Sequence, residues 1–148
     1  MIRQNAPQSV FSLNELTGVT GSVTFTLIPT DWNTLVAKLY ATTLSGTSPT
    51  LDLYIQTQDP QTATFFDVVH FTQLTTSVTE PNAYFAKFGD QKSSALYVGQ
   101  PKQQNISVGS ISGLPLLSRT AKVIYVYGGT VGTANVTLGI EAVDQDYK

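Results

Sequence analysis

The chain of 148 residues has the length of one domain, and 41% of its residues are hydrophobic, which is enough to form a core. Only 12% are charged, against about 25% in an average soluble protein, whereas Thr and Ser together number 33. The net charge of −2 without a basic block argues against a nucleic-acid partner. No apolar run is long enough to cross a membrane. With no Cys and a single His, disulfides, thiolate zinc sites and multi-histidine metal sites are excluded, and no cofactor is expected.

Three segments are expected along the chain. Residues 1–13 mix polar and isolated apolar residues without a period, which predicts an extended N-terminal arm that is held by a few apolar contacts or by a partner. Residues 14–143 contain all the regular patterns and are predicted to form a single β domain. Residues 144–148 are expected to be a short polar tail.

The first two strand patterns lie in the N-terminal third. Residues 19–28 alternate polar and apolar positions, as a half-buried strand does. Residues 35–43 alternate in the same way, although Asp31 or Thr34 could instead cap a short helix there. We favour a strand because the run continues into further β-branched residues and its neighbours are all strand-like.

Residues 51–58 show the clearest strand pattern, after a strong turn signal at residues 45–49. A period of two places alternate residues on opposite faces of a strand. The core is therefore predicted to receive Leu51, Leu53, Ile55 and Thr57, and a solvated or partner-facing surface to carry Asp52, Tyr54, Gln56 and Gln58.

The second half repeats this pattern of short strands and turns. Further strands are predicted at residues 65–71, 83–88, 95–98, 104–108, 121–127 and 134–143, with an edge or bend at 114–117. The glycine-rich residues 128–133 supply the positive φ angles of a hairpin connection between the last two strands. About eight to nine short strands with frequent turns and no helix predict an all-β fold, namely an antiparallel β-sandwich, a jelly roll or a small barrel.

Groups that could carry out catalysis are sparse. His70 shares a face with Phe66 and Val68 on a regular strand, so Asp67 would point to the other face and could not orient the imidazole. No spacing singles out a pair among the acidic residues on or beside strands, which are Asp52, Asp59, Asp67 and Glu141. We therefore predict that the protein is not an enzyme.

Several apolar residues are candidates for contacts with other subunits. Trp32 lies at a turn, where it could anchor a contact or fold over the end of the domain. Phe65 and Phe66 are adjacent, so on a strand they point to opposite faces and one of them must be covered by a second layer, by the arm or by a neighbouring subunit. The candidate contacts with another subunit or with a capsid are Ile2, Val10, Phe11, Trp32, Phe65 and Phe66.

Two stretches carry a resemblance to a known group of proteins. Residues 51–59 (LDLYIQTQD) followed by residues 66–72 (FDVVHFT) resemble the paired strands of small virion proteins of tailed bacteriophages, among them capsid decoration (cement) proteins. Residues 114–120 (LPLLSRT), with the strands that follow them, resemble the closing hairpin of the same proteins. The resemblance implies a non-enzymatic β-sandwich or β-tulip-like shell component, commonly a homotrimer.

Composition and resemblance point to one functional hypothesis. Uncharged Thr, Gln and Ser surfaces avoid repulsion between identical copies and can hydrogen-bond across an interface. We expect a structural virion protein that is made in the host cytoplasm and binds and stabilises a capsid surface. Its partners would be the major capsid protein and copies of itself. The alternative is a carbohydrate- or receptor-binding module, such as a tail-fibre domain, in which Trp32 with Tyr54 or Tyr84 forms a stacking platform.

Overall fold

The structure, a computed structural model, describes residues 8–13, 18–26, 34–75, 82–88, 109–111 and 116–143. Within these ranges the chain forms β-strands and no helix. The strands are β1 (Gln8–Leu13), β2 (Gly21–Thr26), β3 (Thr34–Gln58), β4 (Phe65–His70), β5 (Asn82–Phe88), β6 (Ser110–Ile111) and β7 (Thr120–Val143). The described part of the chain is therefore all-β, as the alternating sequence patterns predict.

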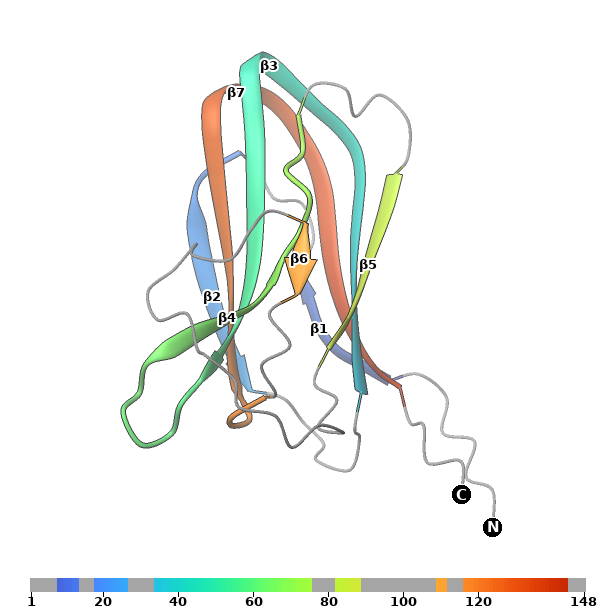
Figure 1. Ribbon diagram of the computed structural model, residues 1–148. Coiled ribbons are helices and arrows are strands. Elements are labelled where there is room, and N and C mark those ends of the chain that lie inside the picture. Colours follow the sequence, from blue (N-terminus) through green and yellow to red (C-terminus); the bar gives the residue numbers. More distant parts are fainter. Residues whose placement is uncertain are drawn as a thin grey trace.

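Two long paired strands form the centre of the fold. β3 has 25 residues and β7 has 24, and they pair antiparallel along their whole length, from Thr34 opposite Val143 to Thr57 opposite Ala121. Both strands arch over together at one end of the molecule (Figure 1). Register shifts in the pairing of β3 with β7 mark this corner, where residues 45–50 lie against residues 128–133.

Glycine makes the corner possible. Gly46 and Gly129 both have positive φ angles, 138° and 67°, which L residues rarely adopt. A Cβ on Gly46 would collide with the Thr130 carbonyl oxygen, and a Cβ on Gly129 would collide with the Ser48 carbonyl oxygen. Each strand thus needs a glycine where the other strand's backbone comes closest.

The corner divides one curled sheet into two halves. The first half-sheet consists of β1, residues 134–143 of β7, residues 34–44 of β3, and β5. The second half-sheet consists of β2, residues 120–128 of β7, residues 50–58 of β3, β4, and β6. Every pairing is antiparallel, and the seven strands form a half-barrel.

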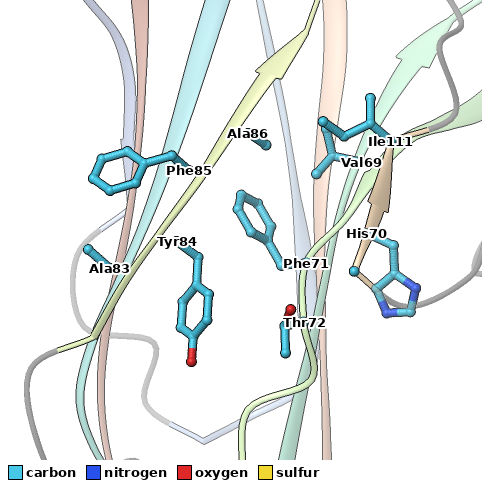
Figure 2. A pocket seen from close by; sticks show the side chains of 10 residues that line it. Val69, His70, Phe71, Thr72, Ala83, Tyr84, Phe85, Ala86 and Ile111 are labelled. Carbon is cyan, nitrogen blue, oxygen red and sulfur yellow. The ribbon is translucent and has the colours of Figure 1, made fainter.

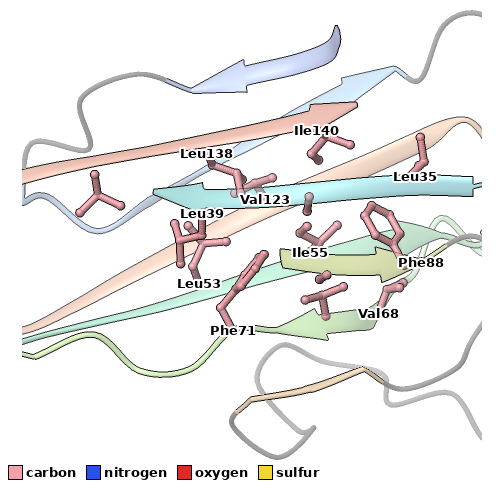
Figure 3. Close-up of a cluster of buried hydrophobic side chains, with 14 of the residues drawn as sticks. Leu35, Leu39, Leu53, Ile55, Val68, Phe71, Phe88, Val123, Leu138 and Ile140 are labelled. Carbon is pink, nitrogen blue, oxygen red and sulfur yellow. The ribbon is translucent and has the colours of Figure 1, made fainter. Parts of the chain in front are cut away.

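The inward faces of both halves form one hydrophobic core (Figure 3). Its members alternate along the strands, as the period of two requires, except at register shifts such as the one that leaves both Val68 and Val69 of β4 in the core. From the first half-sheet come Leu35, Leu39, Leu138, Ile140 and Phe88, and from the second Leu53, Ile55, Val68, Phe71 and Val123. At one side of the half-barrel the rings of Phe11 in β1 and Phe25 in β2 stack with centroids 4.2 Å apart, which joins the two halves there.

The strand predictions are confirmed for residues 21–26, 35–43, 51–58, 65–70 and 83–88, and the helix alternative at residues 35–43 is wrong. The turn at residues 45–49 and the hairpin joint at 128–133 are also wrong as chain reversals. Both segments lie inside long strands, because the bend of one strand is paired with the bend of the other. Four of the predicted short strands are therefore merged into two.

Two further strands differ from the sequence prediction, and several predicted elements lie outside the described residues. Residues 8–13 belong to the predicted arm and form β1, the outermost strand beside β7, while the two-residue β6 has no counterpart in the prediction. The predicted strands at residues 95–98 and 104–108 lie outside the described residues, as do the tail at 144–148 and, of the predicted bend, residues 114 and 115.

Candidate functional site

A group of polar side chains lies on the outer face of the second half-sheet. Tyr54 of β3 is paired with His70 of β4, and Gln56 is paired with Asp67. The register of the two strands shifts between Ile55 and Gln56, which leaves Val68 as the extra residue of a β-bulge. The bulge turns Asp67 to the same face as His70, so the prediction that these two residues point to opposite faces is wrong.

An aspartate on the neighbouring strand holds the histidine. Asp52 Oδ1 lies 3.0 Å from His70 Nε2, and the Gln73 side chain donates a 2.7 Å hydrogen bond to Asp52 Oδ2. The Tyr54 ring stacks on the imidazole with centroids 4.0 Å apart and an interplanar angle of 25°. His70 is thereby fixed by a carboxylate on one edge and by an aromatic ring on one face.

A second pair lies deeper on the same face. Gln56 Nε2 donates a 2.7 Å hydrogen bond to Asp67 Oδ1, and both side chains are fully buried. Gln56 Oε1 is buried as well and has no hydrogen-bond partner. The prediction that Tyr54 and Gln56 face solvent or a partner is therefore wrong, because both faces of this part of β3 are covered.

The burial of this face changes the chemistry of the tyrosine. Desolvation, followed by the negative charges of Asp52 and Asp67, raises the pKa of Tyr54 to about 12. A phenol with that pKa is neutral at physiological pH and does not act as a base.

A groove runs beside His70 along the other side of the half-barrel, where β5 of the first half-sheet approaches β4 and β6 of the second (Figure 2). Its volume is about 300 Å³, at the lower end of the range for small-molecule sites. Tyr84 of β5 and Phe71 lie side by side within it, and Val69 and Ile111 lie on the same side of the groove as Phe71. The lining of the groove is mixed, and its polar side chains are those of His70, Thr72 and Tyr84.

The chemistry of the site follows from these contacts. A carboxylate bound to one imidazole nitrogen is the arrangement that orients a histidine for proton transfer. Asp52 also links β3 to β4 and to the segment after β4 through its two oxygens, so the described contacts equally form a structural clamp. Among the described residues, no group of three or more His, Cys, Asp and Glu side chains could hold a metal ion.

The six residues predicted to make contacts with other subunits do not gather at this site. Phe11 packs on Phe25 within the chain, and Phe65 lies beneath the Lys122 ammonium, which is 3.9 Å from its ring centroid. Phe66 is half-buried opposite Thr57. Ile2 and Trp32 lie outside the described residues, and Val10 is a backbone member of β1 whose side chain is not among those described.

The Asp52–His70 contact is missed by sequence reasoning. The two residues are 18 positions apart and lie on strands whose register the sequence does not specify. The sequence does place Asp52 and Tyr54 on one face of the predicted strand at residues 51–58. Their contacts on an adjacent strand must therefore come from side chains on that same face of the sheet.

Comparison with protein-family models, curated proteins and solved structures finds no match for this chain. Within the described residues, no helix is long and apolar enough to cross a membrane.

Proposed function

We propose that the chain is a structural virion protein that binds the outer surface of a bacteriophage capsid and stabilises it, and that it is not an enzyme. The observation that carries the proposal is the outer face of the first half-sheet. Tyr40 and Phe85 are exposed there at 44% and 67%. Lys38 and Glu141 form a 2.8 Å ion pair on the same face, so these two charges compensate each other there.

A face of this kind suits repeated contact with other subunits. Large exposed apolar side chains on a sheet are favourable when a partner covers them, and interface centres are rich in aromatic residues and poor in unpaired charge. The proposed partners are the major capsid protein and copies of this chain, three of them in the assembly that the sequence resemblance implies. Binding to the assembled shell but not to its separate subunits would stabilise the shell by mass action.

The assignment is tested first by gene neighbourhood, where we expect a major capsid gene beside this one. Expanded heads of that phage lacking this protein are then mixed with the purified chain and sedimented. The chain is expected to pellet with the heads at a fixed number of copies per head and to raise their disassembly temperature. Heads that sediment without the chain at micromolar concentration would overturn the proposal.

Carbohydrate or receptor binding is the second candidate, and the same exposed aromatic residues favour it. Tyr54 cannot contribute to a stacking platform because it is buried, and Tyr84 points into the groove. Tyr40 and Phe85 remain as rings on which a sugar could stack. Glycan-array binding that is lost in Tyr40→Ala, with the fold intact, would support this function, and an array without signal would exclude it.

A further inference from the structure

Gly139 of β7 lies on the outer face of the first half-sheet, and no contact among the described residues requires a glycine there. Its neighbours along the strand, Leu138 and Ile140, are fully buried in the core, so position 139 faces outward. Gly139 is not one of the glycines with a positive φ angle. A Cβ added to it would meet no other atom within 4 Å.

A glycine inside a strand weakens the strand, because it has no side chain to pack and loses much conformational freedom on folding. Such a glycine marks a β-bulge, a tight bend, or a place where a ligand or another chain approaches the backbone closely. The described register is regular at Gly139, which is paired with Lys38 of β3 and with Ser12 of β1. The bend of β7 lies at residues 128–133. A close approach from outside the chain is the cause that remains.

The missing side chain leaves a gap in the outer face, and the charges beside the gap are paired. Lys38, directly opposite Gly139 in the register, forms its 2.8 Å ion pair with Glu141. The next pair of the same two strands on this face is Tyr40 and Thr137. The gap is therefore one side chain wide, with an ion pair on one side and an aromatic ring and a hydroxyl group on the other.

We propose that Gly139 is the point at which the capsid surface meets the backbone of this chain, and that an uncharged side chain of the major capsid protein fills the gap. This inference rests on the proposed function and names the residue that decides whether the two surfaces fit. The occupant is uncharged because Lys38 and Glu141 already compensate each other, so a charged group would be buried without a partner. The occupant belongs to a large surface because the core lies inside the curled sheet, which makes this face convex. A convex face does not enclose a small ligand as binding pockets do.

A second copy of this chain fits the gap poorly. A two-fold contact centred on Gly139 would set one gap against the other and leave a void. Phe85, the more exposed of the two aromatic rings on this face, could fill the gap only about an axis that runs along β3, midway between Phe85 and Gly139. Lys38 lies at that midpoint, since it is paired with both residues, and the axis would place it against its own copy.

Filling the gap by mutation tests the proposal, because stability and binding should respond differently. Gly139→Val places a good strand former at a position with free space, so its midpoint in urea denaturation is expected to equal or exceed that of the wild type. In sedimentation with heads that lack this protein, the same variant is expected to bind at least about tenfold more weakly, because the added side chain overpacks the contact.

Ser22→Val is the matched control, since Ser22 is an exposed residue of β2 in the second half-sheet. It is expected to bind heads as the wild type does. Wild-type binding by Gly139→Val, or a lower urea midpoint for that variant, would overturn the inference and leave the proposed function intact. Failure of the wild-type chain to pellet with heads would overturn both. Glycan binding or self-association that is lost in Gly139→Val would overturn the inference by showing that a sugar or a second copy fills the gap.

Discussion

The corner of the curled sheet yields the sharpest prediction for stability. Gly129→Ala adds one methyl group at a residue with φ of 67°, where its Cβ would collide with the Ser48 carbonyl oxygen of the paired strand. A left-handed backbone costs an L residue about 1–2 kcal/mol. Moving the paired backbone away from the added atom costs about 1–3 kcal/mol more. The free energy of unfolding is therefore expected to fall by about 2–5 kcal/mol, within the combined range of these principles.

The assay is urea denaturation followed by circular dichroism, with Gly139→Ala as the control. Gly139 lies in the same strand and is not one of the glycines with a positive φ angle. A Cβ added at Gly139 would meet no other atom within 4 Å. Its substitution is expected to change stability by less than about 1 kcal/mol, since the only remaining effect is on the unfolded chain. With a slope of about 2 kcal/mol per molar urea, Gly129→Ala should lower the midpoint by at least about 1 M.

A double variant tests whether the two glycines share one corner. Gly46→Ala would collide with Thr130 across the same strand pair, so displacement of the strands by one substitution relieves part of the second collision. The Gly46→Ala/Gly129→Ala variant is expected to lose less stability than the sum of its parts, by roughly 0.5–3 kcal/mol. Strict additivity, or a Gly129→Ala variant as stable as the wild type, would refute the paired corner.

Three further outcomes follow from the buried groups. Burial raises the pKa of Tyr54 and of Tyr127 to about 12, so the folded state keeps phenol protons that the unfolded state loses near pH 10. The stabilisation should therefore be complete below pH 10 and should be lost as the pH rises toward 12. Absorbance at 295 nm should show that both phenols titrate above pH 10 in the folded protein. Asp67→Ala removes the one hydrogen bond that the buried Gln56 amide nitrogen donates among the described residues, and should lower the unfolding free energy by about 2–4 kcal/mol in urea titrations. No loss of stability would mean that the pair is solvated. Leu39→Ala, at a fully buried position, should cost about 2–5 kcal/mol by the same assay, and a loss below about 1 kcal/mol would contradict the described core.

The strand faces could be predicted where one face is buried and the other is not. Along residues 35–41 the apolar positions Leu35, Ala37, Leu39 and Ala41 are all buried, as their alternation predicts. The same rule fails for Tyr54 and Gln56, whose polar character indicated an outward position although both are buried. Alternation states that two faces differ, but it does not state whether a further layer covers the polar one.

The sequence singled out one residue of the candidate site but predicted its surroundings wrongly. His70 stood out because it is the only histidine, but regular alternation assigned Asp67 to the opposite face. The bulge at Val68 reverses that assignment, and bulges arise from the pairing of two strands rather than from the residues of one. The carboxylate that does hold His70 comes from β3, through a contact that only the register of β3 with β4 creates.

The sequence by itself determined that this protein is built of strands, because β-branched and aromatic residues alternate along it and glycine and polar residues interrupt them. It also determined that few charged residues are available to the surface. Only the tertiary structure decided that residues 45–50 and 128–133 are one corner of a continuous sheet and not two turns. A glycine-rich segment permits either geometry locally, and the choice is made by the hydrogen bonds between two strands that lie far apart in the chain.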